Sequence, residues 1–244
     1  MTVRPGIILC IPGPWADRRE LVLAIAKLDA GYLFAGQVLV QSGSDRAWTL
    51  EFEARDERMQ KAFEFGGLGR IPADDLAAVA AHESVAYLIS DEVGIKAADA
   101  IQRAAVTLLR AGGVGVKCEL SGAAFGKARW IELAEHPSRT SLYLSYIFLV
   151  SGDGALFTCG MRTFDLPDAA VADEIDVQDA WELMGEFNIY NLLEAPTLNS
   201  GETFSLSPES PFYRLRHATY DWYAPDDYFH NPNGVWWLDP VWKE

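Results

Sequence analysis

The sequence predicts an α+β fold made of two ferredoxin-like βαββαβ halves, which a bridging helix joins and an irregular aromatic arm follows. Two observations predict the halves: apolar stretches of strand and helix type follow one another in the same order before and after an amphipathic helix, and their spacings agree. A third observation, the lack of sustained periodicity near the C-terminus, predicts the arm. One α+β domain with a single mixed sheet is the alternative, because the halves share little identity. The predicted parts are residues 1–94, 95–112, 113–206 and 207–244.

The first predicted half opens with the apolar strand Ile7–Ile11. Asp17 is the predicted N-cap of a helix that stops by Gly31. Two strands, Tyr32–Gln41 and Trp48–Ala54, then form a hairpin around a small polar turn. The second of these strands alternates apolar and polar residues, so we expect one face of the sheet to contact water.

A glycine-rich stretch, Gly66–Arg70, follows the charged helical segment Asp56–Phe65. A phosphate-binding loop needs a preceding strand and a Lys-Ser/Thr pair, and neither is present. The glycines therefore predict a connection to a second helix, which begins near Pro72 with carboxylates in its first turn. The strand Val85–Ser90 completes the half.

The bridging helix is predicted over Ile95–Ala111, because apolar residues recur at three- and four-residue spacing and a double glycine follows. We expect this helix to pack on both halves. The second half then repeats the element order, with Asp176 as the cap of its second helix. Its first helix is predicted over Ala123–Glu135. Its predicted strands are Val114–Cys118, Leu142–Val150, Ala155–Met161 and Thr203–Leu206.

The arm from Ser207 is dense in aromatic residues and interrupted by prolines. Exposed rings at this density would promote aggregation, so we expect the arm to wrap one half. A binding surface formed by some of the rings is the sharper alternative.

Two phrases resemble a known family: Gly160–Val171, which reads GMRTFDLPDAAV, and Gly201–Phe204. The Pro-Gly-Pro-Trp turn after the first strand and the stretch Tyr32–Gly36 resemble the same family. The sequence resembles an uncharacterised bacterial family catalogued as domain of unknown function four-two-six-one. The resemblance covers most of residues 6–206, whereas the aromatic arm departs from the family's plainer ending. It implies a soluble bacterial protein and supplies no catalytic residues.

The composition bounds the function. Half of the 244 residues are hydrophobic, which is typical of globular proteins, and no apolar run approaches the roughly 18 residues that span a membrane. The first apolar stretch is too short for a signal peptide, so we expect a cytoplasmic protein. Cys10, Cys118 and Cys159 lie singly in apolar stretches, which predicts buried thiols rather than disulfides or a zinc site.

Net charge bears directly on partners. The chain has 35 acidic and 20 basic residues, a formal charge of −15. This charge repels a nucleic acid backbone and attracts basic proteins. Acidity that serves only solubility remains an alternative interpretation.

Catalytic and metal-binding signals are weak. None of the four histidines has the spacing of a hydrolase or metal motif. The stretch Asp226–His230 is the strongest candidate for a cation site, but a turn follows it directly, and polar groups beside turns are usually solvated. The sequence therefore predicts no metal and no cofactor.

These observations favour a non-enzymatic protein-binding module, such as an immunity or inhibitor protein that neutralises a basic toxin. A hydrolase-like enzyme with a dispersed site remains the alternative, because one sequence cannot reveal such a site. The predicted binding residues combine rings with carboxylates: Asp221, Trp222, Tyr223, Asp226, Asp227, Tyr228 and Phe229.

Overall fold

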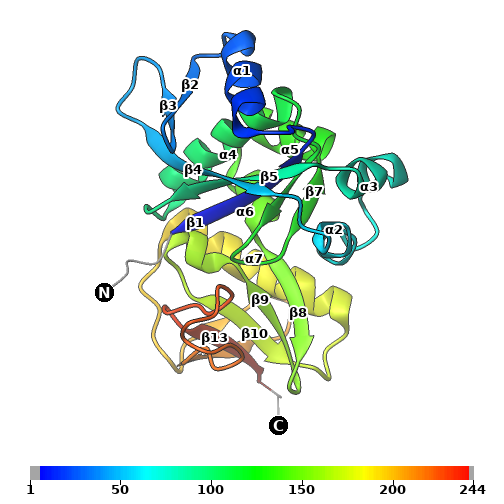
Figure 1. The fold of residues 1–244 in the computed structure, drawn as a ribbon. Helices are drawn as coiled ribbons and strands as arrows, with labels where there is room; N and C mark the ends of the chain where they lie inside the picture. Colours follow the sequence, from blue (N-terminus) through cyan, green and yellow to red (C-terminus); the bar gives the residue numbers. More distant parts are fainter. Residues whose placement is uncertain (1–5, 242–244) are drawn as a thin grey trace. The chain divides into compact units, whose positions relative to one another are not determined.

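A computed structural model describes residues 6–241, and its chain divides into two compact units, Met1–Ser145 and Tyr146–Glu244. Each unit contains one sheet with helices, so the predicted α+β class is confirmed (Figure 1). The division lies inside the predicted second half rather than at the bridging helix. No helix within residues 6–241 is long and apolar enough to span a membrane.

The first unit is built on a seven-stranded antiparallel sheet in the order β2-β3-β4-β5-β1-β6-β7. Its strands are β1 Ile7–Gly13, β2 Tyr32–Ala35, β3 Val38–Gln41, β4 Ala47–Ala54, β5 Ser84–Ser90, β6 Gly115–Cys118 and β7 Ala124–Gly126. Its helices are α1 Arg18–Leu28, α2 Met59–Gly67, α3 Ala73–Ala80, α4 Ile95–Arg110, α5 Lys127–Glu135 and α6 Arg139–Tyr146, the last of which ends at the division.

Local signals in the first unit behave as the sequence predicts. The Asp17 carboxylate accepts a hydrogen bond from the Glu20 backbone N–H at 2.9 Å and caps α1. Trp48 and Leu50 of β4 are buried, whereas Thr49 and Glu51 are exposed, so the predicted alternation is confirmed. All of β1 is buried, as expected for a continuous apolar strand at the centre of a sheet.

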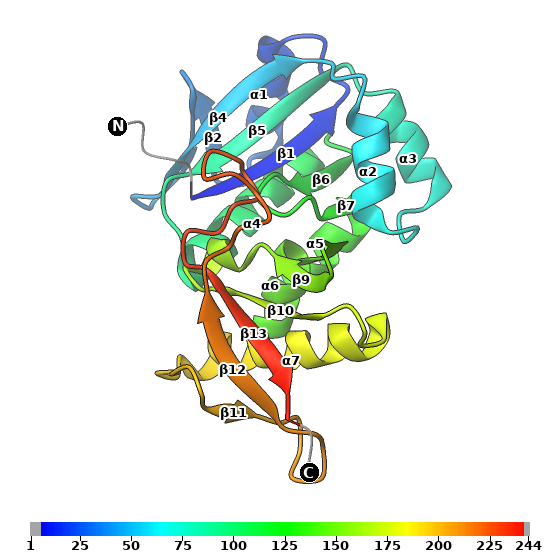
Figure 2. The same cartoon turned by 90° about the horizontal axis from the view of Figure 1, so that it is seen from below.

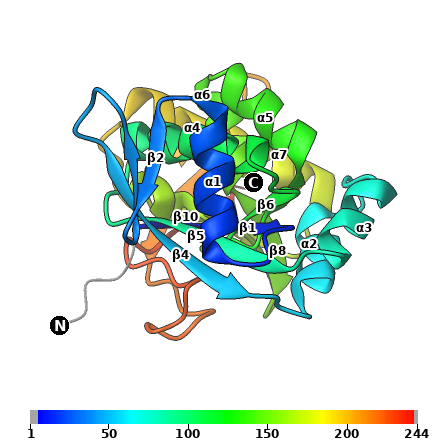
Figure 3. The ribbon, with the colours of Figure 1, turned by 45° about the horizontal axis from the view of Figure 1, so that its top comes forward.

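Helices cover the first sheet. α1 lies beside α4, which also packs on β1, β5 and α5 (Figure 3). The predicted bridging helix is thus confirmed as α4, which ends one residue earlier than predicted. It contacts α1, β1 and β5, which precede it in the sequence, and α5, which follows it. On the other sheet face, Cys10 and Val85 pack against α2 and α3 through Met59, Phe63 and Val79.

The ferredoxin-like halves are not confirmed. In a split βαββαβ arrangement the first strand lies between the third and fourth, but here β5 lies between β1 and β4. Strand β6 opens no second half, because it pairs with β1 in the same sheet. Element order and spacing do not specify which strands pair through their backbones. The apolar side chains of β1 suit burial on both faces but do not select its partners.

Two predicted strands of the sequence also differ in the structure. Tyr32–Gln41 is a hairpin of β2 and β3, since Gly36 adopts a positive φ of 57° and turns the chain. Most of Leu142–Val150 belongs to α6, and strand β8 begins only at Phe148. The apolar run Leu142–Val150 therefore holds the end of a helix and the start of a strand, which periodicity alone does not separate.

Within residues 6–241, the second unit has a six-stranded sheet in the order β11-β12-β13-β10-β9-β8, in which β10 and β13 pair in parallel and the other neighbours antiparallel. Figure 2 shows β12 and β13 running side by side in opposite directions. The unit also contains a 3₁₀ turn and helix α7, whose N-cap is Asp176 as predicted. The bounds are β8 Phe148–Gly152, β9 Ala155–Cys159, the 3₁₀ turn Met161–Phe164, β10 Asp168–Ala172, α7 Val177–Glu194, β11 Thr203–Phe204, β12 Tyr213–Ala218 and β13 Val235–Pro240.

The aromatic arm is more regular than predicted. It contributes β12 and β13, and β13 occupies an inner position in the sheet. The remaining residues 219–234, hereafter the aromatic segment, connect these two strands. The sequence pattern obscured the strands because Trp236 and Trp237 face opposite sides of the sheet and are both large and apolar.

The two faces of the second sheet are covered differently. Helix α7 packs on one face through Ala180, Met184 and Phe187, which contact Trp236 and its apolar neighbours. On the other face, the core cluster contains no helix residue within residues 6–241. Rings of the aromatic segment cover Phe157 and Val235 there instead. The expectation that the arm packs on the protein itself is therefore confirmed.

Gly66 provides a test of packing in the first unit. A Cβ at this position in α2 would lie 2.1 Å from the backbone oxygen of Gly122, which cannot yield without moving the chain. We expect Gly66→Ala to destabilise the unit by about 1–3 kcal/mol, although alanine favours helices by about 1 kcal/mol. Urea unfolding measures the effect, with Lys61→Ala at an exposed position of α2 as the control. A Gly66→Ala protein more stable than the wild type would contradict the packing.

Candidate functional site

The aromatic segment carries all seven predicted binding residues, and among these seven the rings of Trp222 and Tyr223 face inward, beside the buried Tyr220. The Trp222 ring stacks on Phe157 with centroids 3.9 Å apart and planes 8° apart. The Tyr223 ring packs against Phe157 and Tyr220, at centroid distances of 6.4 and 6.2 Å. Trp222 and Tyr223 therefore help to cover their own sheet, and only part of each ring is available to a partner.

The carboxylates and one ring of the segment face solvent. Asp221, Asp226 and Asp227 are exposed, and Tyr228 keeps 55% of its surface accessible. The Asp227 side chain accepts a hydrogen bond from the Phe229 backbone N–H at 2.8 Å, which holds the local turn. Phe229 itself is half-buried edge-on against Tyr223. The functional groups that the segment exposes to solvent are thus three carboxylates and the ring of Tyr228.

A buried carboxylate ties the segment to the sheet. Asp168, at the start of β10, is fully buried, and its Oδ2 accepts a hydrogen bond of 2.6 Å from the Asn231 amide. Its Oδ1 accepts from the Thr158 hydroxyl at 3.1 Å and from the Met161 backbone N–H at 3.2 Å. Asp168 therefore links β9, the 3₁₀ turn and the aromatic segment through a single side chain.

The environment of Asp168 changes its acidity. Burial raises the pKa of this carboxyl to about 7, and the hydrogen bonds from Asn231, Met161 and Thr158 oppose the rise. Asp168 is therefore a titrating anchor near neutral pH.

Arg162 is a second anchor. It is 8% exposed, and its Nη1 donates to the backbone oxygens of Tyr228 and His230 at 3.5 and 3.3 Å. The His230 Nδ1 lies 3.1 Å from the Tyr223 backbone oxygen, so this imidazole is directed to the backbone rather than to the nearby carboxylates. Arg162 and Asp168 both lie in the phrase Gly160–Val171, and their structural role is to hold the aromatic segment in place.

Sequence reasoning missed Arg162 and Asp168 as functional positions. The available signal was weak: both charges lie in a phrase that continues into a buried strand, but the same phrase holds Asp165, which is exposed. A charged residue in such a context is buried only when it is paired or hydrogen-bonded.

Negative charge is concentrated in the second unit. Residues 146–244 contain 17 acidic and four basic side chains, a formal charge of −13 out of the −15 of the whole chain. On α7, Asp179, Glu182 and Glu186 are exposed at three- and four-residue spacing, which places them on one helix face. The second unit therefore presents a strongly acidic surface.

An open pocket of about 390 Å³ lies where the aromatic segment meets the sheet. Trp222 and Trp237 line it with ring centroids 5.7 Å apart. The guanidinium of Arg216 lies 5.1 Å from the Trp237 ring centroid and forms two hydrogen bonds to Asp239. The other lining residues are Asp153, Ala218, Thr219 and Asp221.

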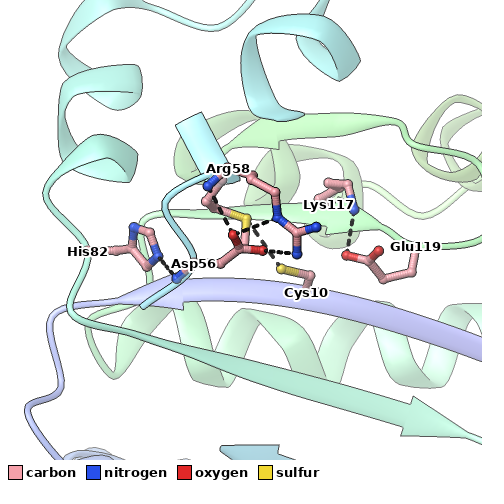
Figure 4. Close-up of polar contacts among 7 residues, drawn as sticks. Cys10, Asp56, Arg58, His82, Lys117 and Glu119 are labelled. Atoms are coloured by element: carbon pink, nitrogen blue, oxygen red, sulfur yellow. Dashed lines mark hydrogen bonds and ion pairs between the residues drawn. The ribbon is translucent and has the colours of Figure 1, made fainter. Parts of the chain in front are cut away.

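The first unit contains a cluster of polar side chains near Cys10 whose residue types could support catalysis (Figure 4). On the sheet, Cys10 is paired in register with Tyr87 on one side and Lys117 on the other. The Lys117 ammonium forms an ion pair of 2.6 Å with Glu119. Figure 4 shows Arg58 directed to Asp56, with which it forms an ion pair of 3.0 Å.

The protonation states in this cluster do not favour catalysis. A nucleophilic cysteine needs a lowered pKa, but burial raises the pKa of the Cys10 thiol well above its usual value, and burial likewise raises the pKa of the Tyr87 hydroxyl. His82 accepts a hydrogen bond at Nε2 from the Asp56 backbone N–H, and its Nδ1 lies 2.6 Å from the Val79 backbone oxygen. The imidazole thus binds the backbone through both ring nitrogens.

The other two cysteines are buried, as predicted. Neither Cys118 nor Cys159 forms a disulfide, and burial raises the pKa of both thiols. Within the described part of the chain, no three histidine, cysteine or acidic side chains are grouped so that they could hold a metal ion.

Comparison with known proteins places the similarity in the second unit. No curated protein and no solved structure is significantly similar to the chain. The matching family model covers residues 157–237, from β9 into β13, and so includes both anchors and the aromatic segment. This extent corrects the expectation that the arm departs from the family. The predicted resemblance itself is confirmed: residues 157–237 match the family described as Domain of unknown function (DUF4261).

Proposed function

We propose that the protein is a non-enzymatic binding module whose second unit binds a basic protein. The observation that carries the proposal is the segregation of charge: the second unit holds −13 of the net −15, whereas the first unit has 18 acidic and 16 basic side chains. A charge needed only for solubility has no reason to be confined to one unit. Such a field attracts a basic partner and speeds its encounter.

The aromatic segment supports the same proposal. Arg162 donates to a backbone oxygen of the segment and Asp168 accepts from the Asn231 side chain, so the exposed Tyr228 and the neighbouring carboxylates are presented on a fixed scaffold. A preorganised surface loses less conformational entropy on binding. The finer form of the proposal is an inhibitor or immunity protein that neutralises a basic toxin. Cys10, Cys118 and Cys159 form no disulfide, which is typical of a reducing compartment and supports action in the cytoplasm.

The test uses the full chain to capture a basic protein from its native cell extract, followed by kinetics with the purified partner. The association rate constant should fall as ionic strength rises, because salt screens exposed charges. We expect the triple variant Asp179→Asn, Glu182→Gln, Glu186→Gln to associate about tenfold more slowly at low salt. The dissociation rate constant should change little.

The control removes the same number of charges from the first unit, by Glu57→Gln, Glu83→Gln and Glu92→Gln, which are all exposed. This variant should associate at nearly the wild-type rate. Equal slowing in both variants would contradict a role for the second unit. Failure to capture a basic protein would contradict the proposal as a whole.

Tyr228→Ala tests the contribution of the exposed ring. Tyr228 is 55% exposed, and the backbone oxygen to which Arg162 donates is retained in alanine, so the fold should tolerate the change. We expect dissociation from the basic partner to accelerate roughly tenfold or more, since interface tyrosines often contribute above about 1 kcal/mol. Thermal unfolding should be unchanged, and unaltered dissociation would place the contact elsewhere. Trp222→Ala is less suitable, because the stacked ring supports the fold.

A further inference from the structure

We propose that the pocket lined by Trp222 and Trp237 receives one arginine or lysine side chain of the basic partner, an inference that rests on the proposed function. The pocket, of about 390 Å³, is at the small end of the roughly 300–1,000 Å³ range of ligand sites. It is open to the surface and formed partly by the segment that carries the exposed carboxylates. These properties suit an inserted side chain of a docked protein.

The lining of the pocket is suited to a cation. Indole rings attract cations through the negative potential of their faces, and tryptophan is the strongest such ring in proteins. Asp221 lines the pocket, and its Oδ2 accepts a hydrogen bond of 2.7 Å from the Thr219 hydroxyl. Asp153 lines it from the turn between β8 and β9. Two carboxylates and two indoles therefore line one small pocket.

Arg216 shows that this environment accepts a guanidinium. It already lies over the Trp237 ring, and Asp239 neutralises it through two hydrogen bonds of 2.9 and 3.2 Å. With Arg216 paired in this way, Asp153 and Asp221 leave the pocket lining with a negative balance. An incoming cation is therefore attracted despite the resident arginine.

The probe for the test is N-acetyl-arginine methylamide, added to full-length protein labelled with ¹⁵N in its tryptophan indoles. Signals of Trp222 and Trp237, assigned by tryptophan to phenylalanine changes, should shift saturably. N-acetyl-citrulline methylamide has the same shape without the charge and should shift them far less. Equal shifts with both compounds would overturn the proposal, because the pocket would not distinguish a cation.

Charge variants separate the pocket from the general field of the unit. Asp153→Asn with Asp221→Asn should weaken binding of the arginine amide about tenfold, or about 1.4 kcal/mol. The matched control, Asp173→Asn with Glu174→Gln, removes two exposed carboxylates that do not line the pocket and should leave binding nearly unchanged. Equal weakening by both pairs would overturn the pocket assignment.

The outcomes also separate this inference from the proposed function. If a basic protein is captured with salt-dependent association but the arginine amide does not bind, the pocket proposal fails and the proposed function stands. If the amide binds specifically but no basic protein is captured, the pocket binds cations and the proposed function fails.

Discussion

Asp168→Ala is expected to destabilise the second unit by roughly 2–6 kcal/mol, because it removes the acceptor of the Met161 backbone N–H and one of the two acceptors of the Asn231 amide, at about 1–3 kcal/mol for each buried N–H left unpaired. Thr158 loses a partner as well, although its hydroxyl can still reach the Ala169 backbone oxygen at 3.4 Å. The aromatic segment should detach from the sheet first, since Asn231 is one of its anchors. Urea unfolding followed by tryptophan fluorescence measures the loss.

The stability contributed by Asp168 should depend on pH. The folded-state pKa of about 7 lies above the ordinary value of 3.8, so between these values the folded protein holds a proton that the unfolded chain has released. Stability from this group is full below about pH 4, decreases as pH rises to about 7, and is constant above. The decrease is on the order of 4 kcal/mol.

Asp168→Asn isolates this pH dependence. The asparagine is neutral throughout and keeps one oxygen, so it should lose less stability than the alanine. The difference in unfolding free energy between wild type and Asp168→Asn should be larger at pH 5 than at pH 8, because the other titrating groups cancel in the comparison. A difference that is constant over this range would show that Asp168 does not titrate there.

Local structure was predictable where one short stretch determines it. The Asp17 cap, the alternation in β4 and the end of α4 before Gly112 each depend on residues within one or two turns. Pairing of β1 with β5 and β6 depends instead on which segments far apart in sequence meet, and several strands of similar composition compete for those positions. The order of elements along the chain therefore suggested two halves that the sheet does not contain.

The sequence predicted where the candidate site lies in the chain, but it did not predict which of its side chains face the core and which face solvent. The density of rings and carboxylates singled out residues 221–229. Trp222 and Tyr223 pack on Phe157 in a core cluster to which, within residues 6–241, no helix residue contributes. This arrangement depends on the tertiary structure, and no local sequence pattern reveals it. Asp168 was missed for the same reason, since its partner Asn231 lies 63 residues away.

Leu108→Ala is expected to destabilise the first unit by about 2–5 kcal/mol, the range measured for leucine to alanine changes in packed cores. Leu108 is 0% exposed on α4, the helix that packs on β1, β5, α1 and α5. The cost depends on how far the surroundings can relax into the space left behind. Many of the buried neighbours along α4 are alanines, such as Ala104 and Ala105, which have no flexible side chain to fill it.

The exposed Leu23 of α1 is the matched control, because it undergoes the same chemical change while 47% of its surface is accessible. Leu23→Ala should cost about 1 kcal/mol or less. Chemical denaturation of both variants under one set of conditions makes the comparison, and Leu108→Val should fall between wild type and Leu108→Ala. Equal costs at the two leucines would mean that α4 is not packed as tightly as its burial indicates, and the central place of this helix in the first unit would have to be abandoned.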